Sequence, residues 1–466
     1  MNLGNIITVA GVAIVLVIVV AGFFLFMSPS MRPKGTSTTI SYTKNPTTTS
    51  TITASGNTTT IAQNHTNING SYTNSSSASS IQNIPVNLPA CGTSDPPFSI
   101  SPIQAQNITY IEPLGHVNPS GGGHVFPINH VYFYLTLYSN RTAIVTTLVS
   151  PGNVTIYKIE SFTYYSGSDH KTPIRNDYTL SFAPCGNATG FFYHISSLSN
   201  KFLSNFTQPF AYCNNVTTGA EYFQSCGKYV NIKAGAGEVL GTVGGQPGGS
   251  QALDWVMEDF RITPLDYAND SRFSSSTGQD YSRYIVCPLD YFSMSVHNTL
   301  YGLLGGYPVN GNFTEIVKRT TPPLCGTTAQ DIPGTVQGNW FAENISSETF
   351  NEGPNLALIH DDINTSVGVF SIGTSMSASG LQAGAYYFTP SNSGPVNRDF
   401  SNVTSDGKVY CYQTKEKIYS NGVLPPTETI ILQLTTPSRL KIERLSTDNC
   451  GSGPWSFTSK HTDFIR

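Results

Sequence analysis

An uncharged apolar run near the start of the chain constrains its architecture most strongly. Residues 6–27 read IITVAGVAIVLVIVVAGFFLFM and contain no charged side chain. A helix needs about 20 apolar residues to cross the hydrocarbon core of a bilayer, so this run is long enough. A cleaved signal peptide has a basic start and a shorter apolar core, and neither is present. The run predicts a signal-anchor transmembrane helix over residues 1–28, which makes the membrane the first expected partner.

The segment after this helix is polar and of low complexity. Residues 29–88 are rich in Ser, Thr and Asn and contain few large apolar side chains. Such a segment buries too little apolar surface to offset the entropy lost on ordering. We expect a disordered, glycosylated stalk that holds the rest of the chain away from the membrane.

Two signals disagree about which side of the membrane the chain occupies. Arg32 and Lys34 follow the apolar run, and the positive-inside rule would place that side in the cytoplasm. Against this stands a high density of Asn-X-Ser/Thr sequons, which are glycosylated in exported segments. Because two basic residues are a weak signal, we predict a single-pass protein of the cell membrane with its C-terminal ectodomain outside. The candidate glycosylation sites are Asn57, Asn64, Asn69, Asn74, Asn107, Asn140, Asn153, Asn187, Asn205, Asn215, Asn269, Asn312, Asn344, Asn364 and Asn402.

The cysteines support the same location. They are even in number, widely spaced and without a CxxC pair, which favours disulfides in an oxidising compartment over a zinc ribbon. Cys213 could pair with Cys226 to close one loop, and Cys411 with Cys450 to close the last domain, but the sequence leaves the connectivity open. The candidates are Cys91, Cys185, Cys213, Cys226, Cys287, Cys325, Cys411 and Cys450.

Composition favours β structure and argues against one class of partner. The net charge of -4 and the pI near 6.1 provide no basic surface, so we expect no nucleic-acid partner. The counts of 25 Tyr, 25 Phe and 42 Gly are typical of strands joined by turns. We therefore predict a mainly β fold with two all-β ectodomains after the transmembrane helix. The predicted boundaries are 89–262 for the first, 263–324 for a linker with extended loops, and 325–466 for the second.

The first ectodomain contains alternating strand patterns. Residues 130–138, 154–159 and 178–182 alternate apolar and polar side chains. In the strand 191–195, simple alternation places His194 on the same face as Phe192.

A family resemblance covers residues 100–261. LVSPGNV at 148–154, FFYHISSL at 191–198 and IKAGAGEVLGTVGG at 232–245 occur in the order seen in lysostaphin/LytM-type zinc metallopeptidases. The resemblance implies the duplicated hybrid motif of that family, an antiparallel β sandwich or half-barrel. It also implies a zinc site, because the family binds its metal through His and Asp side chains.

The metal-binding positions depart from the family pattern. The closing His-x-His strand corresponds to 252–255, where Ala252 and Asp254 occupy the two His positions. The first family ligands correspond to HVFPINH at 124–130. The resemblance then implies His124, His130 and Asp254 as metal ligands, with His194 as the catalytic general base.

Geometry is the difficulty for this ligand set. A straight strand would separate His124 from His130 by about 20 Å. Pro127 and the glycines at 121–123 would have to bend the segment to bring the two rings closer. The alternative is that these histidines form hydrogen bonds within a loop and line a polar cleft.

The second ectodomain has short, evenly spaced strand patterns. Residues 356–359, 367–372, 410–412, 430–434 and 440–443 suit a small β barrel or sandwich. Gly338-Asn-Trp340 near its start and Arg466 at its end resemble the calycin (lipocalin-like) pattern, in which the Arg stacks on the Trp. An ordinary β barrel with a core Trp is the alternative. The sequence His360-Asp-Asp362 could bind a cation or form an Asx turn.

Three functions remain open. The first is a non-catalytic surface protein that binds or organises envelope glycans or surface proteins through a LytM-like β domain. The second is a divergent zinc metalloendopeptidase acting on extracellular peptides or cell-envelope substrates. The third is an adhesin or structural envelope protein. Zinc is the only cofactor that any of these interpretations requires, and whether the protein is an enzyme stays open.

Overall fold

The computed structural model describes residues 87–466, except 93–96, 121–122, 167–168, 219–220, 247–248, 274–281, 312–314, 347–351 and 417–426. The predicted transmembrane helix at 1–28 and nearly all of the predicted stalk at 29–88 lie outside the described residues. So do the sequons Asn57, Asn64, Asn69, Asn74 and Asn312. Within the part of the chain that is described, no helix is long and apolar enough to cross a membrane.

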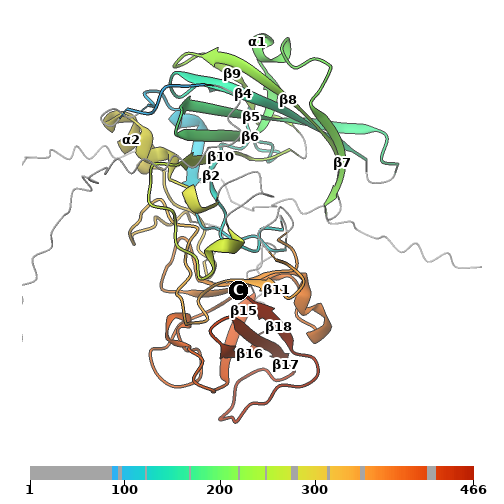
Figure 1. Ribbon diagram of the computed structural model, residues 1–466, viewed down its shortest axis with the longest axis vertical. Helices are drawn as coiled ribbons and strands as arrows, with labels where there is room; N and C mark the ends of the chain where they lie inside the picture. Colours follow the sequence, from blue (N-terminus) through green and yellow to red (C-terminus); the bar gives the residue numbers. More distant parts are fainter. Residues whose placement is uncertain are drawn as a thin grey trace, which may run out of the picture. The chain divides into compact units, whose positions relative to one another are not determined.

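The fold is mainly β, as the composition predicts, and its first part is a ten-stranded sheet. The strand order is β1-β2-β10-β6-β5-β4-β8-β7, with β9 pairing both β3 and β6. Figure 1 shows the long strands β4, β5 and β8 running side by side in green and teal. The strands are β1 Ile108–Glu112, β2 His130–Leu135, β3 Thr146–Val149, β4 Val154–Tyr165, β5 Pro173–Cys185, β6 Ala188–Leu198, β7 Tyr212–Thr218, β8 Glu221–Ala234, β9 Val239–Val243 and β10 Ala252–Asp259.

One face of the sheet is a large apolar core. Trp255 on β10 is fully buried and its ring packs against Phe98, Phe192 and Phe292. Aromatic side chains bury about 150–250 Å² each and contribute strongly to the stability of a core. The residue on either side of Trp255 faces the other way, because side chains alternate along a strand.

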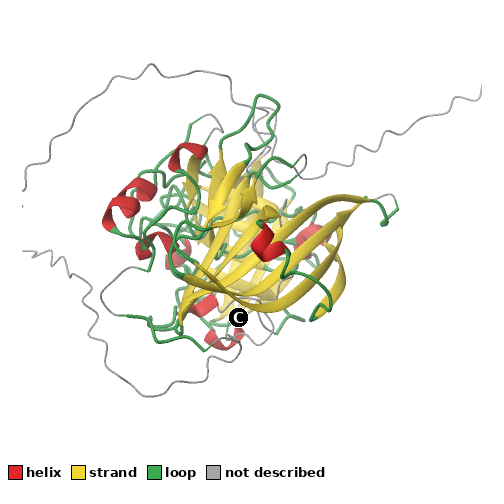
Figure 2. Cartoon of the chain, turned by 90° about the horizontal axis from the view of Figure 1, so that it is seen from above, coloured by secondary structure: helices red, strands yellow, loops and turns green. Residues whose placement is uncertain are grey.

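The second part is a closed barrel of eight antiparallel strands, which is the first of the two predicted alternatives, a small barrel or a sandwich. Strands that follow each other in the sequence lie side by side in the barrel, and β11 pairs with β18 to close it. Figure 2 shows all strands in yellow and the short helical segments in red. The strands are β11 Gly338–Ala342, β12 Leu356–His360, β13 Gly368–Ile372, β14 Gly384–Phe388, β15 Tyr410–Glu416, β16 Thr427–Thr436, β17 Arg439–Leu445 and β18 Thr462–Ile465.

Side chains fill the barrel interior. Phe370, Phe388, Phe400 and Tyr412 are buried and their rings pack against one another. An eight-stranded barrel is just wide enough to be filled in this way. The described part of the barrel is therefore a packed scaffold.

The predicted packing between Arg466 and Trp340 is present. The Arg466 guanidinium carbon lies 4.2 Å from the centroid of the Trp340 ring. Nη1 also donates to the carbonyl of Gln337 at 3.0 Å, and Nη2 donates to the carbonyl of Thr335. The final residue of the sequence thus fixes the beginning of β11.

The segment predicted as a linker contributes to the fold. It carries the helix α2 (Met294–Tyr301) and the short 3-10 helices η2 (Asp270–Arg272), η3 (Ser282–Tyr284) and η4 (Pro288–Tyr291). Leu289, Phe292 and Leu300 from this segment are buried in the core of the sheet. The remaining described helical segments are α1 (Asn200–Leu203), η1 (Ala105–Asn107), η5 (Thr374–Ser379) and η6 (Phe400–Asn402).

The eight cysteines form four disulfides, and these indicate an extracellular or secreted protein. Cys213–Cys226 and Cys411–Cys450 are the two local pairs that the spacing suggested. The other two, Cys91–Cys185 and Cys287–Cys325, join segments that the sequence could not match.

None of the described sequon asparagines is buried. Asn140, Asn153, Asn205, Asn215, Asn344 and Asn402 are exposed, while Asn107, Asn187, Asn269 and Asn364 are partly exposed.

Candidate functional site

Four histidines and four carboxylates gather beside β2, β6 and β10. We call this group the His–carboxylate cluster. All four of the residues that the sequence indicated as catalytic or metal-binding belong to it. Its members are Glu112, His116, His124, His130, Asp177, His194, Asp254 and Asp362.

Strand order explains how residues distant in sequence meet here. β10 lies between β2 and β6, and Asp254 is opposite Tyr132 on one side and Tyr193 on the other. His130 is two residues before Tyr132 on β2, and side chains two apart share a face. Asp254 and His130 therefore lie on the same face of the sheet, opposite to the Trp255 core.

His194 reaches this face through a β-bulge. Between the pairs Leu180–Phe192 and Tyr178–Ile195, β6 has one residue more than β5. His194 has a positive φ of 65°, which is uncommon for a residue other than glycine. A bulge of this kind re-aims a side chain. Simple alternation predicts His194 on the same face of the strand as Phe192. That prediction is wrong, because the extra residue in β6 turns the His194 ring toward Asp254.

Carboxylates contact both nitrogens of the His194 ring. Nδ1 is 2.7 Å from Asp177 Oδ2, and Nε2 is 3.2 Å from Asp254 Oδ2. Burial lowers the pKa of His194, but the Asp254 and Asp177 carboxylates outweigh it and raise that pKa well above its usual value. The raised pKa favours a protonated ring, which can donate one hydrogen bond to each of these carboxylates.

His130 is a buried, neutral imidazole. Its Nδ1 is 2.9 Å from Asn129 Oδ1, which is an acceptor, so this nitrogen carries the hydrogen. Burial lowers the pKa of His130 well below its usual value, and the neighbouring histidines lower it further. The lone pair is consequently on Nε2, which is buried without a hydrogen-bond partner.

Nε2 of His130 faces the carboxylate of Asp254. The distance to Asp254 Oδ2 is 3.4 Å, longer than an ordinary N–H···O hydrogen bond. The second oxygen, Oδ1, is also buried without a hydrogen-bond partner. Burial raises the pKa of Asp254, although the His194 cation partly offsets that effect. Two buried acceptor atoms facing each other are costly unless a proton or a cation lies between them.

His124 completes the predicted set because its loop bends back. The His124 and His130 rings lie 5.8 Å apart between centroids, far closer than a straight strand would allow. Gly123 has a positive φ of 75°, and Ile128 donates its backbone N–H to the carbonyl of His116 at 2.9 Å. The predicted bend is therefore present. Burial, followed by His116 and His194, lowers the pKa of His124 to about 4, so this ring is also neutral at neutral pH.

A second group in the cluster has the spacing of metal ligands. Among the described residues, donor atoms of Glu112, His116 and Asp362 all lie within 4.8 Å of one another. The sequence missed Glu112 and His116, because neither belongs to a motif of the resembled family. Two features of the sequence could have identified them: the spacing Glu112-x-x-x-His116 and the apolar residues that flank both positions. Asp362 was noted only within His360-Asp-Asp362.

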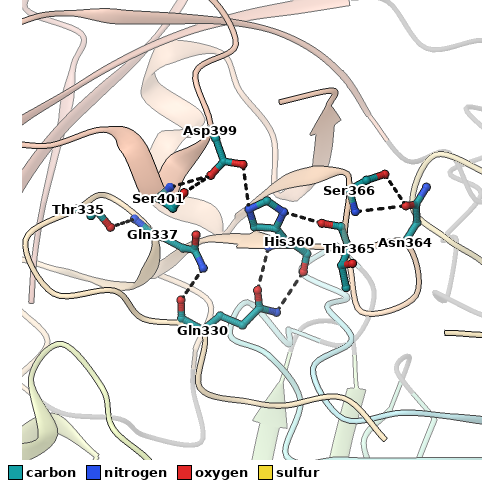
Figure 3. Close-up of polar contacts among 9 residues, drawn as sticks. All are labelled: Gln330, Thr335, Gln337, His360, Asn364, Thr365, Ser366, Asp399 and Ser401. Carbon is teal, nitrogen blue, oxygen red and sulfur yellow. Dashed lines mark hydrogen bonds and ion pairs between the residues drawn. The ribbon is translucent and has the colours of Figure 1, made fainter. Parts of the chain in front are cut away.

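His360 is separate from the cluster and serves a structural purpose. Figure 3 shows its ring between the carboxylate of Asp399 and the carbonyl of Thr365. Nδ1 is 2.8 Å from the Thr365 oxygen, and the backbone N–H of His360 donates to Gln330 Oε1 at 2.9 Å. Asp361 accepts from the backbone of Asn364 at 2.8 Å, which is the Asx turn considered for this sequence.

No family model, curated protein or solved structure matches this chain. The geometry of the His–carboxylate cluster is therefore the basis for any functional assignment.

Proposed function

We propose that this protein is a membrane-anchored cell-surface glycoprotein that binds a divalent metal ion of the zinc type at His124, His130 and Asp254, and thereby binds envelope components without cleaving them. The single observation that carries the metal assignment is the pair of buried acceptor atoms at His130 and Asp254. A neutral imidazole nitrogen without a hydrogen-bond partner lies 3.4 Å from a carboxylate oxygen.

The spacing of these atoms fits shared coordination. With metal–ligand bonds of about 2.0–2.1 Å, neighbouring ligand atoms of a tetrahedral zinc site lie about 3.3 Å apart. The His130–Asp254 distance of 3.4 Å is close to that value. The His124 ring is a neighbour of this pair, with its centroid 5.8 Å from that of His130, and we assign it as the third ligand.

His194 is assigned a positioning role in this proposal. Its imidazolium holds the Asp254 carboxylate on one side and the Asp177 carboxylate on the other. Groups that hydrogen-bond to a ligating carboxylate fix its orientation and tune the metal. His194 therefore keeps Asp254 turned toward His130.

The arrangement favours binding over hydrolysis. A metallopeptidase of the resembled type needs a general base close to its metal, and the His194 ring has both nitrogens engaged as donors. A zinc ion with three protein ligands has an open position for an oxygen donor. The oxygen-rich glycans and proteins of a cell envelope provide such donors.

The remaining parts of the proposal rest on the sequence. The apolar run at 6–27 supports the anchor, and the density and exposure of the sequons support glycosylation. The LytM-like order of motifs supports an ancestral zinc-binding sheet whose ligands have changed. The Trp340–Arg466 packing supports a calycin-like origin for the barrel.

Metal analysis of the full-length protein in detergent tests the proposal. The wild-type chain is loaded with zinc, dialysed and compared with His130→Gln. The matched control is His461→Gln, which removes a partly exposed histidine paired with Asp463 at 3.3 Å. We expect His130→Gln to lose one equivalent of zinc and the control to lose none. Equal zinc in all three proteins contradicts the metal site, and chelator-sensitive peptide cleavage by the wild type contradicts the non-hydrolytic assignment.

A further inference from the structure

Glu112, His116 and Asp362 form a compact group of buried donors that the site described above does not use. Their exposed fractions are 3%, 6% and 5%, respectively. His116 Nδ1 lies 3.5 Å from Glu112 Oε1 and 3.6 Å from Asp362 Oδ1. Both distances exceed an ordinary hydrogen bond, but they are close to the separation of about 3.3 Å between neighbouring ligands of a tetrahedral metal ion.

An unpartnered atom supplies an independent indication of a ligand. The second oxygen of Asp362, Oδ2, is buried without a hydrogen-bond partner. The contacts of His116 Nδ1 are to Glu112 Oε1 and Asp362 Oδ1, and neither of them engages Asp362 Oδ2. Leaving a buried carboxylate oxygen unsatisfied is costly.

Among the described residues, Arg319 lies beside this group and donates a hydrogen bond to a backbone carbonyl. Arg319 Nη1 donates at 2.6 Å to the backbone carbonyl of Asp362, not to its carboxylate. Gly306 packs so closely against Glu112 Oε1 that an added Cβ would overlap it. The close approach of Gly306 restricts where the Glu112 carboxylate can lie.

We propose that Glu112, His116 and Asp362 bind a second divalent metal ion. The combination of one imidazole and two carboxylates favours an ion of the zinc or manganese class over calcium, which prefers an all-oxygen set. This site is distinct from the one at His130 and Asp254, and it shares no ligand with it.

The ligands come from both parts of the fold, which gives the ion a structural role. Glu112 ends β1 of the sheet, His116 lies in the loop that follows, and Asp362 follows β12 of the barrel. Phe126 of the same loop donates its backbone N–H to Glu352 of the barrel at 2.8 Å. The metal ion therefore joins the sheet to the barrel at a place where the two already make contact.

A two-by-two set of full-length variants separates this proposal from the proposed function. The proteins are wild type, His116→Gln, His130→Gln and the double variant, each loaded with zinc and then analysed for bound metal. We expect two equivalents for wild type, one for each single variant and none for the double variant. His461→Gln serves again as the control and should match wild type.

A second measurement guards against a folding defect. Asp362→Asn preserves shape and removes one ligand, so its near-UV circular dichroism should match wild type. Changes to residues that only orient a ligand cost about 10–100-fold in affinity. Loss of a ligand itself should weaken zinc binding at this site by more than about 100-fold.

Each outcome bears on one site. If His116→Gln and Asp362→Asn both bind as much zinc as wild type, the second site is overturned, whatever the result for His130→Gln. If instead only His130→Gln retains the wild-type zinc content, the proposed function fails and the second site stands.

Discussion

His130 Nε2 and Asp254 Oδ2 face each other at 3.4 Å in the protein interior without a hydrogen bond between them. Strand pairing imposes this arrangement, since β10 lies beside β2 and both side chains share one face. A cation between the two atoms would remove the cost of such a contact, which is the reason for the metal ion that we propose there.

Acid should destabilise the protein through its neutral histidines. The folded-state pKa of His124 is lowered to about 4, whereas an unfolded histidine titrates near its usual value of about 6.5. Between these values the unfolded state binds more protons, so stability rises with pH. The stabilisation is present above about pH 6.5 and is lost as the pH falls through about 4. Melting temperatures measured across this range with a chelator present should decrease toward acid pH.

A matched variant identifies the group responsible. His124→Gln removes one of the titrating histidines, so its melting temperature should depend less steeply on pH between about 4 and 6.5. His461→Gln should retain the wild-type profile. Identical profiles for His124→Gln and wild type would assign the acid sensitivity to other groups.

Replacing Asp177 with Asn should lower the pKa of His194 and destabilise the fold. Asp177 accepts the Nδ1–H of His194 at 2.7 Å, and charge-assisted hydrogen bonds contribute about 1.5–3 kcal/mol. The folded-state pKa of His194 is raised, so its stabilising effect is complete below its unfolded pKa and is lost as the pH rises through the folded value. NMR titration of the His194 ring in wild type and Asp177→Asn measures the shift directly. An unchanged His194 pKa would mean that Asp177 does not hold the imidazolium.

Arg466→Ala should destabilise the barrel by more than about 2 kcal/mol. The change removes the ring contact with Trp340 and leaves the carbonyls of Gln337 and Thr335 without their donor. Arg466→Lys should restore little, because an ammonium group lacks the planar fork that spans two carbonyls. Chemical denaturation measures the loss. Arg439→Ala is the control, since Arg439 forms an exposed ion pair with Glu343 that should contribute about 0–1 kcal/mol.

Sequon occupancy should follow exposure of the asparagine amide. Asn153, Asn344 and Asn402 are exposed and should be modified. Asn107 is partly exposed and its Nδ2 donates to Thr146 Oγ1 at 2.8 Å, so this amide is already engaged. Glycopeptide mass spectrometry of protein purified from its native membrane should find the first group occupied and Asn107 unmodified. Occupied Asn107 with unmodified Asn153, Asn344 and Asn402 would contradict the prediction.

Much of the barrel was predictable because its strands are regular. Four predicted strand segments coincide with β12, β13, β16 and β17, and no segment extends beyond its strand by more than one residue. These segments are 356–359, 367–372, 430–434 and 440–443. The missed strand β14 reads GAYYF, where adjacent Tyr386 and Tyr387 obscure the alternation. β18 has only four residues, which are too few to show a clear alternation in the sequence. Its pairing in the folded barrel identifies it as a strand.

The candidate site was predictable in its members but less so in its geometry. The resemblance to a zinc peptidase family drew attention to His124, His130, His194 and Asp254, and all four lie together. The bulge at His194 could not be read from local alternation, because it depends on the register between β5 and β6. Glu112 and Asp362 are distant in sequence, so only the folded chain brings their carboxylates to His116.

Competitive zinc titration of the His116→Gln chain tests the central claim most directly, because that variant retains only the site at His130 and Asp254. The account predicts one zinc ion bound per chain, and a loss of more than about 100-fold in affinity when His130→Gln is added. Zinc binding of the same stoichiometry and affinity with and without His130 would contradict it.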